Sequence, residues 1–161
     1  MLLIEDTRNQ IGKHKAVNEY LESQGHKVVR SKMLVGDYML ANDGSISIDT
    51  KMSVMELIAD VYQQHDRFRR ECQLAQEAGI KLYVLVEEEL PNGRLDEWVA
   101  PKWKTFGRNH HAGDPMSKAD PKRLRKALIT MQEKYGVRFR FCKKADTGAE
   151  IIKLLTEGKQ Q

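Results

Sequence analysis

Asp37, Asp49 and Lys51 are the residues whose types and spacing most favour chemistry in this chain. Asp49 and Lys51 lie two positions apart in the stretch 45–51, where polar and apolar residues alternate as they do in a half-buried strand. Side chains two apart on a strand point to the same face, so these two are expected to lie side by side. Asp37 comes from the preceding extended stretch, 37–41, and joins them only if the hairpin between the two stretches has the right register.

The hairpin register can be judged from which residues it buries together. A two-residue loop at 43–44 would set polar residues against apolar ones across the hairpin. A three-residue loop at 42–44, with Gly44 in the left-handed conformation, sets apolar against apolar. Its pairs are Leu40 with Ile46, Tyr38 with Ile48, and Asp37 with Asp49. We therefore predict the three-residue loop, which brings the two carboxylates about 5 Å apart at the backbone with Lys51 beside them.

Two carboxylates this close repel each other unless they share a proton or a cation, and their hard oxygen atoms suit Mg²⁺ or Mn²⁺. Such an ion polarises a bound phosphoryl group and lowers the pKa of an attacking water, while a neighbouring ammonium orients that water or stabilises charge. This chemistry is phosphodiester hydrolysis. The competing interpretation is that Asp37 caps a turn, while Asp49 and Lys51 form a weak surface pair.

Strands and helices alternate along most of the sequence, which is typical of an α/β fold. Apolar runs and alternating segments predict strands at 2–4, 28–29, 33–35, 37–41, 45–51, 81–86 and 137–141. Helical spacing of apolar residues predicts helices near 16–21, from Ser53 to Gly79 as one long helix, at 118–134 and at 147–155. The expected architecture is a central mixed β-sheet flanked by helices, with an antiparallel hairpin near the start.

Composition and charge exclude several classes of protein. The chain has 161 residues, 40% of them hydrophobic, and no apolar run near the ~18 residues of a membrane span. Its two cysteines lack the spacing of a disulfide framework or a zinc site, and no Gly-rich phosphate-binding motif indicates a nucleotide cofactor. We expect a single domain over 1–161, in a soluble cytoplasmic protein.

Residues 90–116 lack clear periodicity and are predicted to form an irregular insertion within this domain. Basic residues concentrate between 102 and 126, an arrangement that suits phosphate binding as well as an ordinary solvated face. The candidates for contact with a phosphate backbone in this stretch are Lys102, Lys104, Arg108, Lys122 and Arg125.

Four motifs, in their order along the chain, resemble the XPF-type nuclease domain of structure-specific endonucleases, a branch of the PD-(D/E)xK superfamily. They are Asp6-Thr7-Arg8, Leu34-Val35-Gly36-Asp37-Tyr38, Ile48-Asp49-Thr50-Lys51 and Asp66-Arg67-Phe68. The resemblance covers residues 1–90 and, more weakly, 137–155. It implies a restriction-endonuclease-like core, divalent-metal-dependent cleavage of DNA and association as a homodimer.

The resemblance also implies a role for each matching residue. It implies that Asp37, Asp49 and the Thr50 carbonyl bind the metal ion. It implies that Lys51 is catalytic, with Asp6 and Arg8 in the same cleft. Arg67, with Arg70 nearby, is implied to contact DNA.

Two departures from the family pattern bear on these roles. The usual Glu-Arg-Lys is Asp-Thr-Lys at 49–51, which shortens one ligand by a methylene and removes one cation. An acidic residue is expected early in the following helix, and Glu56 lies about one residue from that place, where it would be a further metal ligand. Glu56 is equally well explained as the partner of Ser53 in a helix capping box.

We predict a metal-dependent DNA endonuclease that acts on branched, flap or partly single-stranded DNA, from a prokaryotic or phage source. Two alternatives stay open: a catalytically silent DNA-binding or scaffolding module, and a Holliday-junction resolvase of the same superfamily. Retention of both aspartates and the lysine favours an enzyme over a silent module.

Overall fold

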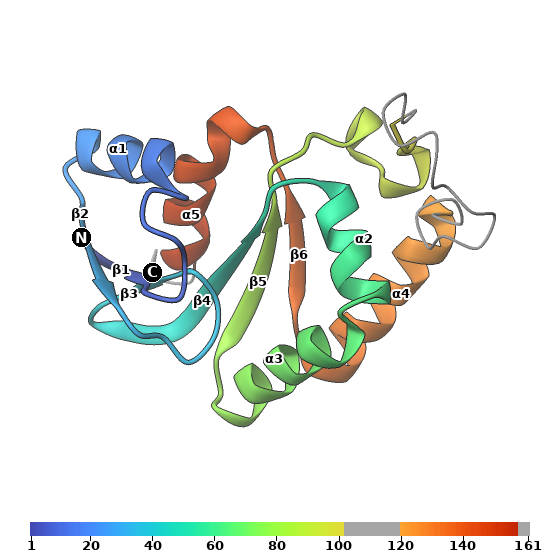
Figure 1. The fold of residues 1–161 in the computed structure, drawn as a ribbon, viewed down its shortest axis with the longest axis horizontal. Coiled ribbons are helices and arrows are strands. Elements are labelled where there is room, and N and C mark those ends of the chain that lie inside the picture. The colour runs from blue at the N-terminus through green and yellow to red at the C-terminus, as the bar shows by residue number, and fades with distance from the viewer. Residues whose placement is uncertain (102–119, 158–161) are drawn as a thin grey trace.

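The computed structural model describes residues 1–101 and 120–157 (Figure 1). In chain order its strands are β1 (Leu2–Asp6), β2 (Lys27–Ser31), β3 (Tyr38–Leu40), β4 (Asp43–Lys51), β5 (Lys81–Val86) and β6 (Arg138–Phe141). Its α-helices are α1 (Lys15–Ser23), α2 (Val54–Tyr62), α3 (His65–Glu77), α4 (Pro121–Tyr135) and α5 (Thr147–Leu155). Short 3₁₀ turns lie at Pro91–Gly93, Leu95–Glu97 and Lys144–Asp146.

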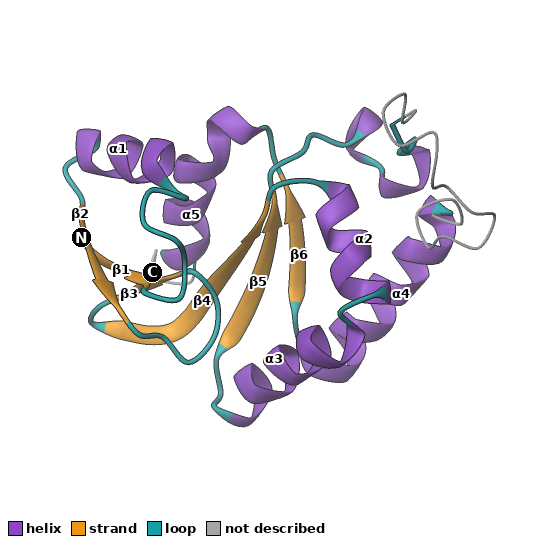
Figure 2. Ribbon diagram, in the orientation of Figure 1, coloured by secondary structure: helices purple, strands orange, loops and turns teal. Residues whose placement is uncertain are grey.

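The strands form one mixed sheet in the order β2-β1-β3-β4-β5-β6. Strand β3 runs antiparallel to both of its neighbours, β1 and β4, and the other pairs are parallel. Helices α1 and α5 cover one face of the sheet, and α2, α3 and α4 cover the other (Figure 1 and Figure 2). The predicted α/β class, a mixed sheet with an early antiparallel hairpin, is confirmed. Within the described ranges, no helix is long and apolar enough to cross a membrane.

Strand β5 divides the hydrophobic core into two halves. Leu82, Val84 and Val86 pack on the side of α2, α3 and α4, whereas Tyr83 and Leu85 pack on the side of α1 and α5. Each of these side chains is 2% exposed or less. Because the strand is covered on both faces, its sequence is apolar throughout instead of alternating. This buried strand holds β4 beside it in parallel register.

Two helices occupy the range 53–79, so the prediction of one long helix is wrong. Helix α2 ends at Tyr62 and α3 begins at His65. The amides of Gln63 and Gln64 both donate to the Ala59 carbonyl, at 2.8 and 2.9 Å, which ends the regular helical pattern. Every residue from 63 to 67 is exposed. No buried side chain therefore holds the backbone helical across this junction.

The hairpin of β3 and β4 keeps the predicted register next to the predicted site. Tyr38 pairs with Ile48, and both side chains are fully buried in the half of the core beneath α1 and α5. A shift by one residue would turn one of the two side chains away from the core, so their common burial fixes the register. Just before β3, the Asp37 amide donates a hydrogen bond of 2.7 Å to the Ile48 carbonyl, which brings the Asp37 backbone alongside Asp49.

The predicted three-residue loop and the pairing of Leu40 with Ile46 are wrong. Leu40 pairs instead with Asp43 across a tighter turn, and residues 44–46 form a bulge in β4. The Asp43 carboxylate accepts a hydrogen bond of 3.0 Å from the Ser45 amide, which bends the strand there. The bulge absorbs the difference in loop length, so the register beyond it is the one that burial favours.

The loop before Asp37, where the sequence predicts a strand at 33–35, is irregular and lies against β4. The Ser47 hydroxyl donates to a carbonyl of this loop at 2.7 Å. Gly36 has a φ of 77°, and a Cβ at this position would overlap the Ser47 hydroxyl and lie 3.0 Å from the Ile48 carbonyl oxygen. Only glycine therefore allows the loop to approach β4 closely enough for Asp37 to bond to it.

We expect Gly36→Ala to lower the free energy of unfolding by about 2 kcal/mol or more, because it adds steric overlap to backbone strain. Gly25→Ala is the matched control, since Gly25 has a φ of 83° but no atom within 4 Å of an added Cβ. Gly25→Ala should lower the free energy of unfolding by only about 1 kcal/mol, the cost of placing alanine in the left-handed conformation. Urea denaturation measures both losses, and equal losses would contradict the close approach.

Candidate active site

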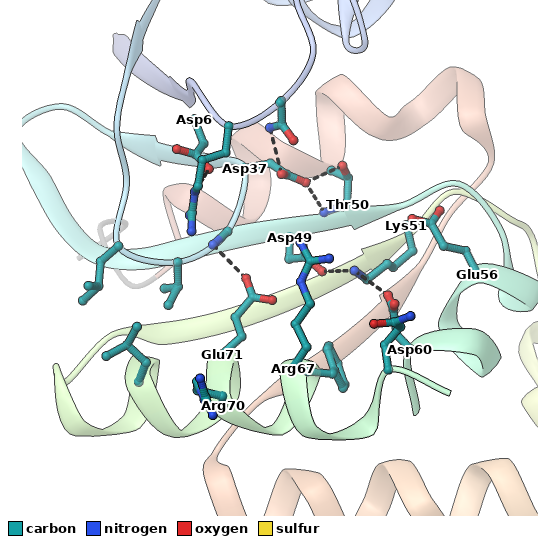
Figure 3. Close-up of a pocket in the computed structure, with 18 of the residues that line it drawn as sticks. Asp6, Asp37, Asp49, Thr50, Lys51, Glu56, Asp60, Arg67, Arg70 and Glu71 are labelled. Carbon is teal, nitrogen blue, oxygen red and sulfur yellow. Dashed lines mark hydrogen bonds and ion pairs between the residues drawn. The ribbon is translucent and has the colours of Figure 1, made fainter. Parts of the chain in front are cut away.

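A cavity of about 380 Å³ lies beside the end of β4, bounded by the loops after β1 and before β3 and by helices α2 and α3 (Figure 3). Charged side chains dominate its lining. The acidic ones are Asp6, Asp37, Asp49, Glu56, Asp60 and Glu71, and the basic ones are Arg8, Lys13, Lys51, Arg67 and Arg70. The structure therefore brings together every residue that the sequence predicts to be catalytic or metal-binding.

Asp37 is held at both oxygens of its carboxylate. Oδ2 accepts hydrogen bonds from the amide and the hydroxyl of Thr50, each at 2.7 Å, and Oδ1 accepts one from the Asn9 side chain at 2.9 Å. The side chain thus turns toward Thr50 and not toward the face that Asp49 shares with Lys51 (Figure 3). A carboxylate offers about four acceptor positions, so Asp37 retains capacity for another ligand. The Thr50 carbonyl points to the same edge of β4 as its amide.

Asp49 and Lys51 lie side by side on the face of β4 that α2 and α3 cover, as their spacing predicts. Lys51 Nζ lies 2.8 Å from Asp49 Oδ2 and 2.7 Å from Asp60 Oδ2. Figure 3 shows the ammonium between these two carboxylates. The side chains of Asp49 and Lys51 are only 10% and 11% exposed, which rules out a weak pair on the surface.

The charges in this cavity act on one another through a mostly buried environment. Burial raises the pKa of Asp49, and the carboxylates of Asp37 and Glu71 raise it further against the opposing effect of Lys51. Burial lowers the pKa of Lys51, but Asp49 and Asp60 outweigh burial and raise it above its ordinary value. Lys51 is therefore a protonated ammonium.

Asp6 and Arg8 form an ion pair beside the cavity, with Arg8 Nε 2.6 Å from Asp6 Oδ2. The Asp6 carboxylate also accepts a hydrogen bond of 3.0 Å from the Met33 amide, and its own amide donates to the Asp37 carbonyl at 2.9 Å. Asp6 is 3% exposed, whereas the Arg8 side chain is 55% exposed. Asp6 therefore fixes the loop that carries Asp37, and Arg8 remains accessible to a phosphate.

Glu56 lines the cavity and also belongs to the N-terminal cap of α2. Ser53 Oγ accepts a hydrogen bond of 3.1 Å from the Glu56 amide, and the Glu56 carboxylate accepts one of 2.6 Å from the Met52 amide. A second carboxylate, that of Glu88, accepts from the Val54 amide at 3.1 Å. Ser53 therefore caps α2 as predicted, but the reciprocal half of the capping box differs, because Glu56 bonds the Met52 amide before the helix and not the Ser53 amide. A metal-binding role for Glu56 stays a prediction.

One face of α3 borders the cavity through Arg67, Arg70, Glu71 and Leu74, whose spacing is that of a single helix face. Glu71 accepts a hydrogen bond of 3.1 Å from the Gly36 amide, which ties α3 to the loop before β3. Arg67 and Arg70 are exposed. They are therefore free to contact an anion that enters the cavity (Figure 3).

Two of the other predicted phosphate-binding residues, both described on α4, do not line this cavity. Lys122 is exposed on α4, and Arg125 lines a separate cavity beside the 3₁₀ turns. Lys102, Lys104 and Arg108 lie outside the described residues, with much of the predicted insertion at 90–116. The described start of that insertion is fixed by Trp98, which is 4% exposed and donates its Nε1 to Glu88 at 2.6 Å.

Asp60, Glu71 and Asn9 are cavity residues that the sequence did not single out. Asp60 lies four positions after Glu56, and Glu71 lies four positions after Arg67. Residues four apart on a helix share a face, so this spacing was the available signal for both acids. Asn9 gives no such signal, because it reaches Asp37 from a loop.

The donor set of the cavity fits a hard divalent cation. Within the described parts of the chain, no cluster of three or more His, Cys, Asp or Glu side chains is arranged as a metal cage. Mg²⁺ does not need one, since it commonly uses one or two protein carboxylates and completes its shell with water and substrate phosphate. Asp37 and Asp49, with the Thr50 carbonyl beside them, match this open mode of binding.

Comparison with known proteins relates this fold to solved nuclease structures. The chain is similar to XPF from Aeropyrum pernix, at 18% identity and a TM-score of 0.66, over 100% of this chain and 66% of that one. It is also similar to XPF from Aeropyrum pernix in complex with DNA, at 19% identity and a TM-score of 0.63, over 99% and 65% of the two chains. The chain thus spans slightly less than two thirds of these relatives. No curated protein sequence matches it.

The sequence of this chain also matches the model of a protein family. The model of the ERCC4 domain matches residues 6–155, a range that contains every residue of the candidate site. The match covers far more than half of the chain, and the structural neighbours have the same mixed sheet flanked by helices. This protein therefore belongs to the ERCC4 domain family and has the fold of an XPF-type nuclease domain.

Proposed function

We propose that this protein is a divalent-metal-dependent endonuclease that hydrolyses phosphodiester bonds in branched or flap DNA. The observation that carries the proposal is the convergence of Asp37, Asp49 and Lys51 on one charged cavity. A buried ammonium beside hard oxygen ligands suits a reaction in which negative charge develops on a phosphate. Arg67 and Arg70 at the same cavity supply positive charge for the DNA backbone.

Asp37 and Asp49 are the residues that would hold Mg²⁺ or Mn²⁺, together with the Thr50 carbonyl. When bound, the ion lowers the pKa of a coordinated water and polarises the scissile phosphate. The Lys51 ammonium orients the attacking water or stabilises the charge that develops on the phosphate. The exposed Arg8 holds a neighbouring phosphate.

Family membership supports nuclease activity, and one of the similar structures is described as a complex with DNA. The preference for branched or flap DNA follows from the resemblance to structure-specific endonucleases. A silent module would bind DNA without cutting it, and a resolvase would cut four-way junctions in preference to flaps. Retention of Asp37, Asp49 and Lys51 favours the enzyme. Homodimerisation stays a prediction that sedimentation equilibrium would check.

We expect Asp49→Asn to reduce metal-dependent cleavage by about 100-fold or more, because the neutral amide loses the charge that holds the cation. DNA binding should remain, since the basic residues are unchanged. The measurement is single-turnover cleavage of flap, fork, four-way-junction and single-stranded DNA, with Mg²⁺ or Mn²⁺.

Glu133→Gln is the control for this experiment, because Glu133 is an exposed acid on α4. It should cleave within about twofold of the wild type, as expected of a surface substitution. Equal cleavage by Asp49→Asn, or no cleavage by either protein, would refute the catalytic assignment. Cleavage confined to four-way junctions would favour the resolvase.

Arg67→Ala and Arg70→Ala should each weaken DNA binding and reduce the slope of log K against log salt by about 1, since each removes one phosphate contact. Arg69→Ala is the matched control, because Arg69 lies on the same helix and pairs with Asp66 at 3.5 Å, away from the cavity lining. Fluorescence anisotropy at several salt concentrations measures the slopes. An equal change for Arg69→Ala would place DNA elsewhere on α3.

Glu56→Gln separates the capping role of Glu56 from a metal-binding role. The amide oxygen of glutamine can still accept the hydrogen bond from the Met52 amide, so stability should change by less than about 0.5 kcal/mol. We expect the metal concentration for half-maximal cleavage to stay the same. An increase of about tenfold would instead identify Glu56 as a ligand. Glu56→Ala, which removes the hydrogen bond to the Met52 amide but leaves the Ser53 cap, should cost about 1 kcal/mol.

A further inference from the structure

Helix α2 carries an acidic residue, Asp60, that has no part in the functional roles described so far. Asp60 Oδ2 lies 2.7 Å from Lys51 Nζ, as close as the Asp49 contact of 2.8 Å. This oxygen is hidden from solvent, and in the described part of the chain Lys51 is its one polar partner. A buried carboxylate oxygen is costly unless it is paired, so its contact with Lys51 accounts for its position.

Lys51 needs a second partner if Asp49 binds a cation. Asp49 is both the neighbour of Lys51 and a proposed metal ligand. A divalent ion at Asp49 takes up the charge of that carboxylate and repels the nearby ammonium. With Asp49 alone, Lys51 would be displaced when the ion binds. Asp60 contacts the ammonium from a different element, α2, and can hold it after Asp49 is engaged (Figure 3).

A third contact restricts the same ammonium. The centroid of the Phe68 ring lies 5.7 Å from Lys51 Nζ, within the range of a cation–π interaction. Phe68 is 3% exposed and comes from α3. Lysine has a long flexible stem, and contacts from β4, α2 and α3 together restrict the position of its charge.

We propose that Asp60 is a positioning residue, which holds the Lys51 ammonium at the scissile phosphate while Asp49 engages the metal ion. It acts through Lys51 and touches neither the metal ion nor the DNA. The inference rests on the proposed function. The resemblance to XPF-type nucleases predicts an acidic residue early in α2. Glu56 lies about one residue from that position, and its carboxylate is bonded to the Met52 amide. Asp60, one turn further along the same helix, supplies a carboxylate to the site.

The test is a double-mutant cycle with Asp60→Asn, Lys51→Met and the double variant, by steady-state cleavage of flap DNA with Mg²⁺. Asp60→Asn should lower kcat roughly 10- to 100-fold with KM little changed, the usual effect of losing an outer-shell partner. Asp60→Glu should recover part of that loss. The double variant should be no slower than Lys51→Met, because Asp60 acts only through Lys51. Glu77→Gln, an exposed acid on α3, is the control with unchanged activity.

A kcat for Asp60→Asn within about twofold of the wild type would overturn the inference. A further loss from Asp60→Asn in the Lys51→Met background would overturn it too. Thermal denaturation identifies any variant that fails to fold, and Asp60→Ser, which also removes the charge, then serves in place of Asp60→Asn. If the wild type cuts no DNA, the proposed function fails, and a crystal structure of Asp60→Asn still tests the contact. That structure is compared with the wild type, both with Mn²⁺ bound: displacement of Lys51 Nζ in the variant supports positioning, and an ammonium in the same place in both overturns it.

Discussion

The close approach of Gly36 to β4 is the constraint on which the rest of the site depends. A side chain at this position would overlap Ser47, so the loop can reach the strand only with glycine in the left-handed region. The approach lets the Asp37 amide bond the Ile48 carbonyl and the Asp37 carboxylate bond Thr50. The backbone, which is stiffer than any side chain, therefore places the first of the two proposed metal ligands.

The second proposed metal ligand, the Asp49 carboxylate, is held by its ion pair with Lys51. Asp49, Lys51 and Asp60 lie together where water is largely absent, and their ion pairs are strong only because the surroundings are poorly polarisable. Such an arrangement is weak support for the fold, since bringing charges out of water costs about as much as pairing them returns. The apolar core on both faces of β5 supplies the stability that this cluster does not. Folding stability alone therefore does not explain why these charges lie together.

The sequence predicted the strand faces and the hairpin register, which depend on burial of apolar side chains. It missed the bulge in β4, where a single hydrogen bond bends the backbone. The two-residue period placed Asp49 and Lys51 on one face, and the burial of Tyr38 and Ile48 set the register beside Asp37. The bulge in β4 follows from one bond between the Asp43 carboxylate and the Ser45 amide. Apolar patterns contain no information about such a bond. The break between α2 and α3 was missed because apolar residues recur at helical spacing on both sides of it.

The direction of the Asp37 side chain and the departure from the family's Glu-Arg-Lys pattern have a common explanation. Asp37 lies outside β3, so the alternation of strand residues does not govern where its carboxylate points. Thr50 stands where the family pattern has arginine, and its hydroxyl and amide both donate to Asp37. Threonine at this position thus lacks the positive charge of arginine, but its hydroxyl donates a hydrogen bond that orients Asp37, a proposed metal ligand. In the same way the shorter Asp49 stays close to its own strand, where Lys51 and, through it, Asp60 can reach it.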